Sequence, residues 1–230
     1  FANYINQPLN LSPIGTHLFD LYRFVYERNE KLNSTEIGEV DAWFKDNSKY
    51  QSPDPAYAYL QGIIKGKNLI VIQVESLESV VLNKSYNNQE ITPNLNKLIS
   101  KSTYFSNIHE QVKDGNSSDA ELLFNTSTYP ISSGSAFIRF GNNTYNSLPK
   151  LLNNYGYTSV AMHGDDKNFW NRNIVFKAIG FKQYITEEQF KYKKQEGMGI
   201  LDEGLFTEAV NEIGTLKQPF NLFLITLTSH

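Results

Sequence analysis

The stretch Asn68-Leu-Ile-Val-Ile-Gln-Val-Glu-Ser76 decides the fold that we expect for this chain. It is a run of apolar, mostly β-branched residues of the length of one strand, and it ends at a carboxylate, Glu75. A continuous apolar run of this length is typical of a strand buried on both faces, as in parallel sheets. The stretch therefore predicts a strand over residues 68–74 with a charged group at its carboxyl end.

Strand patterns and helix patterns alternate after this stretch. The further strands that we expect are Ser102–Ile108, Thr158–Met162 and Phe220–Thr228. The helices that we expect between them are Thr92–Lys101, Ser118–Ser127, Ser147–Tyr155, Trp170–Ile179 and Asp202–Ile213. This alternation predicts an α/β fold, with a mostly parallel central sheet and helices on both faces. In such sheets, ligands bind at the carboxyl ends of the strands.

Residues 1–66 precede this domain and are more polar. Apolar residues at helical spacing predict one helix around Leu18 to Val25, and Ser34-Thr35-Glu36 predicts the start of a second helix that runs to about Phe44. The cluster Ser52-Pro-Asp-Pro55 is typical of a linker. We therefore expect a helical connector over residues 1–66 and an α/β domain over residues 67–230.

Composition excludes several classes of protein. The 230 residues carry a net charge of −3, whereas a general nucleic-acid binder needs a basic face, so we expect no nucleic-acid partner. Cysteine is absent, which excludes disulfides and thiolate metal sites. No run approaches the roughly 18 apolar residues of a membrane span. The chain begins at Phe1 without an initiator Met and stops at His230 directly after a strand pattern, so we expect a piece of a longer protein.

Polar side chains gather directly after the expected strands. Glu75 ends the first, 116–119 follow the second, 163–165 follow the third, and Ser229-His230 end the last. If the strands are parallel, these groups meet at one rim, and a carboxylate, hydroxyls and histidines there would suit a hard metal ion or a phosphate. Glu75 is either a metal ligand or a solvated carboxylate at a strand end.

Two segments in this set could act on a phosphate. In Asp114-Gly-Asn-Ser-Ser-Asp-Ala-Glu121, Ser117 or Ser118 would lie at a helix N-terminus, which favours an anion and helps a hydroxyl to ionise; the alternative is plain helix capping. In His163-Gly-Asp-Asp-Lys-Asn-Phe-Trp-Asn-Arg172, arginine could bind phosphate through two hydrogen bonds; the alternative is a surface ion pair.

Together these residues resemble the lipoteichoic acid synthase family of the alkaline phosphatase and sulfatase superfamily, over nearly the whole chain. Asn68 to Ser76 looks like the strand that ends in the metal-binding glutamate, and Gly115-Asn-Ser-Ser-Asp-Ala-Glu121 looks like the nucleophile loop, whose family form is Gly-Lys-Thr-Ser-Asp-x-Glu. Other parts also resemble the family: the segment after its last transmembrane helix, its substrate-binding stretch and a strand end with a second histidine. These are Ser12–Arg23, Met162-His-Gly-Asp with Phe169-Trp-Asn-Arg172, and Leu227-Thr-Ser-His230.

The resemblance implies an alkaline phosphatase-like fold and a metal-dependent phosphoglycerol transferase. Ser117 would be the nucleophile, Glu75 and Ser117 would bind Mn²⁺ or Mg²⁺, and the substrate would be oriented by His163, Trp170, Arg172 and His230. Ser117 would take glycerol phosphate from phosphatidylglycerol, forming a covalent glycerophospho-enzyme, and pass it to a growing lipoteichoic acid chain. The resemblance also implies a Gram-positive bacterium and the extracellular face of its membrane, or secretion after cleavage, with a transmembrane region before this chain.

The sequence departs from the family at two points. Ser117 stands where the family usually has threonine, although serine serves elsewhere in the superfamily, and the later Asp and His metal ligands are expected beyond residue 230. Other functions stay open: a lipoteichoic acid primase that acts on a glycolipid anchor, a phosphodiesterase or sulfatase, and a non-catalytic glycerol-phosphate or wall-polymer binding module.

Overall fold

The computed structural model describes residues 12–29, 31–48 and 54–230, and the chain divides into two compact units, Phe1–Lys65 and Gly66–His230. The first unit contains the helices α1 (Pro13–Asn29) and α2 (Ser34–Asn47) and the 3-10 helix η3 (Pro55–Leu60). Asn33 caps α2, because its side chain accepts hydrogen bonds from the backbone of Thr35 and Glu36 while Glu36 accepts one in return. Both predicted helices are confirmed.

The linker that was expected at residues 52–55 is described only in part. Part of the expected linker, Ser52 and Pro53, lies outside the described residues, while Asp54 caps η3 by accepting a hydrogen bond from the backbone of Ala56. In the part of the chain that the structure describes, no helix has the length and apolar character that a membrane crossing requires. The role of residues 1–66 as a connector stays a prediction.

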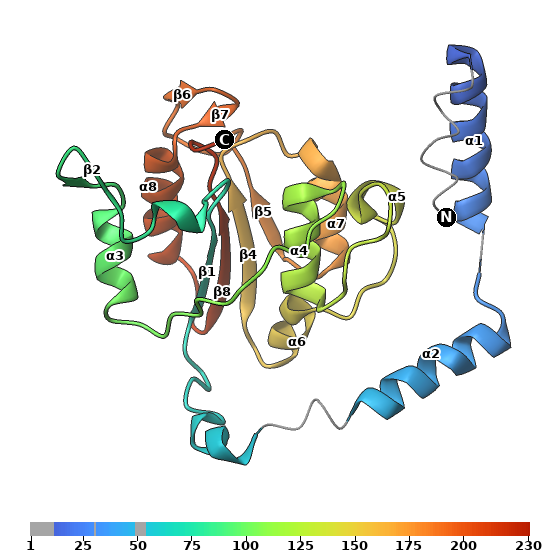
Figure 1. Cartoon of the computed structure of the whole chain (residues 1–230), viewed down its shortest axis with the longest axis horizontal. Helices are drawn as coiled ribbons and strands as arrows, with labels where there is room; N and C mark the ends of the chain where they lie inside the picture. The colour runs from blue at the N-terminus through green and yellow to red at the C-terminus, as the bar shows by residue number, and fades with distance from the viewer. Residues whose placement is uncertain (1–11, 30, 49–53) are drawn as a thin grey trace. The chain divides into compact units, whose positions relative to one another are not determined.

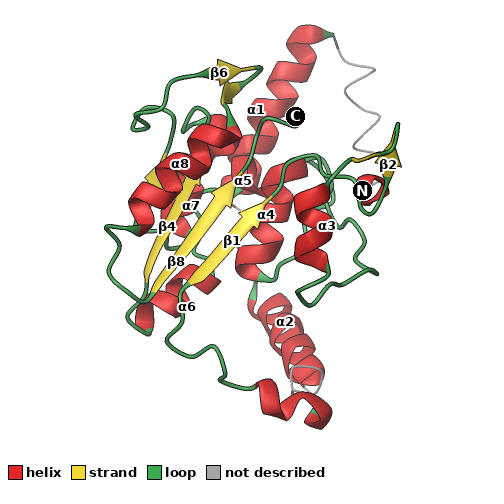
Figure 2. Ribbon diagram, turned by 90° about the vertical axis from the view of Figure 1, so that its left-hand side faces the viewer, coloured by secondary structure: helices red, strands yellow, loops and turns green. Residues whose placement is uncertain are grey.

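A four-stranded parallel sheet forms the centre of the second unit (Figures 1 and 2). Its strands are β1 (Leu69–Gln73), β4 (Thr158–His163), β5 (Gln183–Ile185) and β8 (Phe220–Ile225), in the order β1-β8-β4-β5. All neighbours are parallel, which confirms the α/β fold. The rest of the unit contains the hairpins β2 (Ser85–Tyr86) with β3 (Gln89–Glu90) and β6 (Gln195–Glu196) with β7 (Gly199–Ile200), and the 3-10 helices η4 (Ser79–Val81) and η5 (Phe169–Asn171).

Helices cover both faces of this sheet. The helices of the second unit are α3 (Pro93–Ile99), α4 (Asn116–Thr126), α5 (Ala136–Arg139), α6 (Leu148–Asn154), α7 (Arg172–Ala178) and α8 (Asp202–Ile213). Figure 1 shows α8 on one side of the strands and α4 and α7 on the other. Each side has its own apolar core: Phe223 and Ile225 of β8 face α4 and α7, while Leu222 and Leu224 face α8. This alternation makes β8 buried along its whole length.

Three details of the predicted strands are wrong. The first predicted strand forms over Leu69–Gln73, but Ile70 and Ile72 are each 47% exposed, because β1 is at the edge of the sheet and α8 covers the other strands. Residues 102–108 form no strand; they are a loop in which Phe105 and Ile108 are exposed. The short strand β5 has no clear apolar run and was not predicted.

Candidate active site

Hydrogen bonds between the segments that follow β1 and β8 fix the position of Glu75. The backbone N–H of Glu75 donates to the hydroxyl oxygen of Thr226 at 2.9 Å, just past the end of β8. The Ser229 hydroxyl donates to the backbone oxygen of Glu75 at 2.7 Å. Glu75 is therefore held at the rim where two parallel strands end, with its carboxylate half-buried. That position is the one in which ligands of parallel sheets bind.

Ser117 lies in the first turn of α4 and faces this carboxylate. Its hydroxyl donates to Oε2 of Glu75 at 2.9 Å, across 42 residues of sequence. Plain capping does not describe Ser117: the N-cap of α4 is Gly115, where no side-chain hydrogen bond caps the helix. The structure brings Glu75 and Ser117 together, and the hydroxyl is half-buried beside an anionic oxygen at a helix N-terminus.

The neighbouring Ser118 is differently placed. Its side chain is fully buried, its hydroxyl lies 2.7 Å from the backbone oxygen of Gly115, and a second contact of 2.8 Å joins it to the Ser135 hydroxyl. Through these contacts Ser118 joins the loop before α4 to the segment before α5. The sequence left open which serine faces a ligand, and the geometry favours Ser117.

The loop before α4 is held by the side chain of Asp119. Its carboxylate accepts hydrogen bonds from the backbone N–H groups of Lys113 and Gly115 at 2.9 and 3.0 Å. A Cβ at Gly115 would lie 2.2 Å from the Asp119 carboxylate, so the turn has no room for a side chain there. Asp119 therefore fixes the path by which the backbone enters α4.

Arg172 begins α7 and is paired with a residue that the sequence analysis did not single out, Glu121 of α4. Three contacts join them: Nε to the two carboxylate oxygens at 3.1 and 3.0 Å, and Nη2 to Oε1 at 2.7 Å. Arg172 is 1% exposed and Glu121 is fully buried, so the alternative of a surface ion pair is wrong. Its spacing could have indicated Glu121, because a residue four positions after Ser117 lies on the same face of a helix.

The three contacts of 2.7–3.1 Å between the guanidinium and the carboxylate have the geometry of a charge-assisted pair. Burial raises the pKa of the Glu121 carboxyl, and the charge and hydrogen bonds of Arg172 oppose that rise. Burial acts to lower the pKa of Arg172, but the charge and hydrogen bonds of Glu121 outweigh it and raise that pKa. The negative charge of Glu75 also acts on Glu121, so the two carboxylates share one electrostatic neighbourhood.

His163 ends β4 and is buried, with 2% exposure. Its Nδ1 lies 2.9 Å from the backbone oxygen of Ile225, which can only accept, so Nδ1 carries the proton and Nε2 is left as an acceptor. Nε2 lies 3.9 Å from Oδ2 of Asp165. Burial, then the charge of Arg172, lower the pKa of His163 to about 3, and the Ile225 contact opposes them. The imidazole is therefore neutral at physiological pH.

A pH experiment checks this assignment. Because the folded-state pKa is about 3 and the usual value is 6.5, the unfolded chain binds a proton between these values and the folded chain does not. The stability associated with neutral His163 is fully present above pH 6.5 and is lost as the pH falls toward 3, by roughly 1.4 kcal/mol per unit. Urea unfolding from about pH 8 to about pH 4 should therefore show wild type losing stability faster than His163→Asn. Parallel curves would contradict the assignment.

Trp170 and His230 complete the predicted set. The backbone of Trp170 and that of Asn171 are both left-handed, with φ of 55° and 60°, so η5 and α7 replace the single helix that was expected. Such backbone is strained for a bulky residue and is common at functional sites. His230 is exposed and donates its backbone N–H to Leu227 at 3.0 Å. Trp170 lies in the segment after β4, and His230 lies in the segment after β8. Whether they bind substrate stays a prediction.

Glu75 and Ser117 are the groups on this rim that could hold a metal. Both offer oxygen, the donor that Mn²⁺ and Mg²⁺ prefer, and their 2.9 Å contact shows that they share one location, so this donor set fits part of a hard-metal shell. Within residues 12–29, 31–48 and 54–230, no group of three or more His, Cys, Asp or Glu side chains could hold a metal ion.

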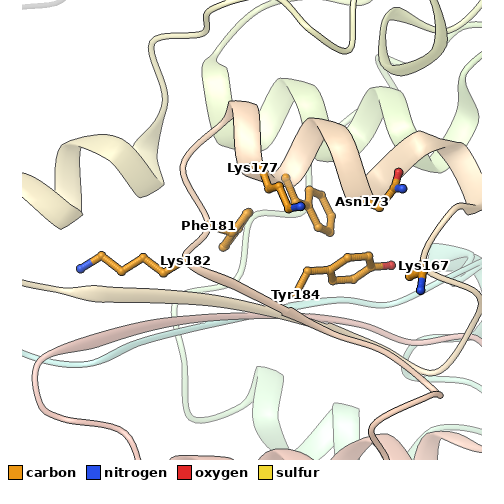
Figure 3. Close-up of a pocket in the computed structure, with 7 residues that line it drawn as sticks. Lys167, Asn173, Lys177, Phe181, Lys182 and Tyr184 are labelled. Carbon is orange, nitrogen blue, oxygen red and sulfur yellow. The ribbon is translucent and has the colours of Figure 1, made fainter.

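A pocket of about 180 Å³ lies between α7 and β5, apart from Glu75 and Ser117 (Figure 3). The Tyr184 hydroxyl points along it toward Lys167, while Lys182 extends away at the other end. Burial raises the pKa of the Tyr184 hydroxyl, which has no hydrogen-bond partner in the described part of the chain. None of the predicted site residues lines this pocket; its full lining is Lys167, Asn173, Phe176, Lys177, Phe181, Lys182 and Tyr184.

Comparison with known proteins gives consistent matches. The sulfatase family profile matches residues 67–230. Lipoteichoic acid synthase 1 of Bacillus subtilis is 41% identical over 211 residues, which are 89% of this chain and 32% of that protein. Lipoteichoic acid synthase of Staphylococcus aureus is 35% identical over 96% of this chain and 34% of its own length. The crystal structure of lipoteichoic acid synthase LtaP from Listeria monocytogenes superposes with a TM-score of 0.73 at 31% identity, covering 78% of this chain and 44% of that one. The chain thus spans about a third of the length of its curated relatives.

Proposed function

The chain belongs to the sulfatase family and is similar to lipoteichoic acid synthases, as its motifs predicted, and we propose that it transfers glycerol phosphate from phosphatidylglycerol to a growing lipoteichoic acid chain. The observation that carries this proposal is the 2.9 Å contact between the Ser117 hydroxyl and Glu75 at the carboxyl end of the sheet. A hydroxyl held by a carboxylate at a helix N-terminus has the surroundings of an activated nucleophile.

The transfer has two steps that use the same hydroxyl. In the first, Oγ of Ser117 attacks the phosphorus of phosphatidylglycerol and loses its proton; the bond between phosphorus and the diacylglycerol oxygen breaks, and that oxygen takes up a proton as diacylglycerol leaves. In the second, the terminal hydroxyl of the acceptor attacks the serine-bound phosphorus and loses its proton; the bond between phosphorus and Oγ breaks, and Ser117 takes up a proton. The Glu75 carboxylate accepts the hydrogen bond of Ser117 and so orients the attacking oxygen.

One hydrogen-bond donor and one hydrogen-bond acceptor would recognise the substrate. Nη1 of Arg172 is a donor without a partner among the described residues and suits a phosphate oxygen. Nε2 of His163 is an acceptor and suits a glycerol hydroxyl. Trp170 and His230 stay proposed substrate contacts on the same rim. A Mn²⁺ or Mg²⁺ ion on Glu75 and Ser117 would lower the pKa of the hydroxyl and neutralise phosphate charge.

The cellular location and the acceptor of the whole protein are part of the proposal. Phosphatidylglycerol is a membrane lipid, so the enzyme would work at the extracellular face of a Gram-positive cell membrane, with a glycolipid or lipoteichoic acid as acceptor. A primase would instead use only the glycolipid anchor, and a phosphodiesterase would use water. Product analysis with each acceptor distinguishes these reactions.

Mass spectrometry of the trapped enzyme tests the proposal. The full-length protein is incubated with phosphatidylglycerol and Mn²⁺ without acceptor, quenched, digested and fragmented. A glycerophosphate group should appear on Ser117. Ser118→Ala is the matched control and should keep the adduct, because Ser118 faces the protein interior. Turnover without any adduct would contradict covalent catalysis, and binding without turnover would indicate a non-catalytic module.

A further inference from the structure

The Glu121–Arg172 pair joins the helix of the nucleophile to the helix of the proposed phosphate-binding arginine. Glu121 contacts both Nε and Nη2 of Arg172, and two-point contact fixes the plane of the guanidinium as well as its position. The pair is buried on both sides, so water does not compete for these hydrogen bonds. The side chain of Arg172 is therefore held in one orientation before any ligand binds.

One nitrogen of Arg172 is left over. Nη1 is buried and has no hydrogen-bond partner in the described part of the chain. An unsatisfied buried donor on a cation is costly unless an acceptor reaches it. Because Glu121 takes the opposite edge of the guanidinium, it decides in which direction Nη1 points. The ring of Phe169 lies 5.7 Å from the guanidinium carbon and packs against its face.

The position of Glu121 on α4 relates this nitrogen to Ser117. Residues 117 and 121 are four apart and so lie one above the other on the same helix face. Gln73, at the end of β1, acts on both: its amide donates to the backbone oxygen of Ser117 at 3.5 Å, and it interacts with the Glu121 carboxylate and favours its charged form. Ser117 and Glu121, the partner of Arg172, therefore belong to the same helix.

We propose that Glu121 is a positioning residue, which holds the guanidinium of Arg172 in register with Ser117 so that Nη1 meets the phosphate under attack. This inference rests on the proposed function, in which Arg172 binds that phosphate. Stability alone would not require the pair, because well-packed apolar side chains often replace a buried ion pair without loss of stability. An apolar pair could not supply an oriented cation.

Glu121→Gln in the full-length enzyme tests this role, because glutamine keeps the shape and one acceptor oxygen but loses the charge. We expect the affinity for glycerol 1-phosphate, measured by calorimetry, to fall roughly tenfold to a hundredfold. We expect Mn²⁺ affinity to fall less than glycerol-phosphate affinity, since the oxygen atoms of Glu75 and Ser117 are unchanged. Glu188→Gln is the matched control: it breaks the exposed Lys167–Glu188 pair of 3.0 Å and should leave both affinities unchanged.

A double-mutant cycle separates positioning from a merely structural role. If Glu121 acts through Arg172, Glu121→Gln should cost glycerol-phosphate affinity in the wild type and nothing further in an Arg172→Met background, with all affinities measured under conditions in which circular dichroism shows each variant to be folded. Equal losses in both backgrounds would overturn the proposal, as would wild-type affinity in Glu121→Gln. If wild type binds glycerol phosphate but transfers none, the proposed function fails, and the calorimetric cycle still decides the role of Glu121.

Discussion

Ser117→Ala in the full-length enzyme is expected to lower turnover by a factor on the order of 10⁴ to 10⁶, the loss typical of removing a nucleophile. The variant lacks the hydroxyl oxygen that we propose forms the covalent bond to phosphorus, while the fold is expected to stay intact because Ser117 is half-buried and packs at a helix start. Steady-state release of diacylglycerol from phosphatidylglycerol measures the effect.

Two variants control this experiment. Ser117→Thr keeps a hydroxyl at the same position and should retain activity. Ser118→Ala removes hydrogen bonds to Gly115 and Ser135 and should reduce stability by about 1 kcal/mol while turnover continues. If Ser118→Ala stopped the reaction and Ser117→Ala did not, the nucleophile would be Ser118 and the contact between Ser117 and Glu75 would have another purpose.

Arg172→Ala is expected to destabilise the domain by about 3–5 kcal/mol, because it leaves the Glu121 carboxylate buried without its partner. Loss of glycerol-phosphate affinity in this variant would therefore be mixed with partial unfolding. Urea denaturation of wild type and variant at neutral pH measures the difference.

The size of the loss can be compared with two other variants. Lys167→Ala breaks the exposed pair with Glu188 and should cost less than about 1 kcal/mol. Replacing both buried charges, with Glu121→Leu and Arg172→Met together, should recover much of the stability that Arg172→Ala loses, since no unpaired charge remains. A midpoint for Arg172→Ala equal to that of wild type would show that the pair contributes nothing to folding.

The parts of the fold that could be predicted are those with a local pattern. The strands at 158–163 and 220–225 follow from apolar runs, and α8 follows from its spacing and its acidic first turn. The prediction of a strand at 102–108 was wrong. Strand propensity depends on the neighbours against which a segment packs, and among the described residues no strand pairs with this segment. Strand β5 pairs with β4 through three residues, too short a run to recognise.

In the candidate site, too, the residues with a local pattern could be predicted, whereas contacts between distant residues could not. Glu75 and Ser117 stood out because each follows a local pattern, a strand end and a helix start. Their contact spans 42 residues, and that of Arg172 with Glu121 spans 51, so neither could be derived from spacing. Glu121 was predicted only as part of a helix start, whereas in the structure its carboxylate makes three contacts with Arg172.

The order of the strands in the sheet has a consequence while the chain is being synthesised on the ribosome. Glu75 depends on Thr226, which follows it by 151 residues, and β1 pairs with β8. At about 5–20 residues per second, a ribosome needs roughly 8–30 s to make that length of chain. For that interval β1, an apolar strand, is outside the ribosome without its neighbour and is a target for aggregation. We therefore expect a chaperone that binds extended apolar segments to raise the yield of folded protein, by shielding residues 69–74 until β8 arrives.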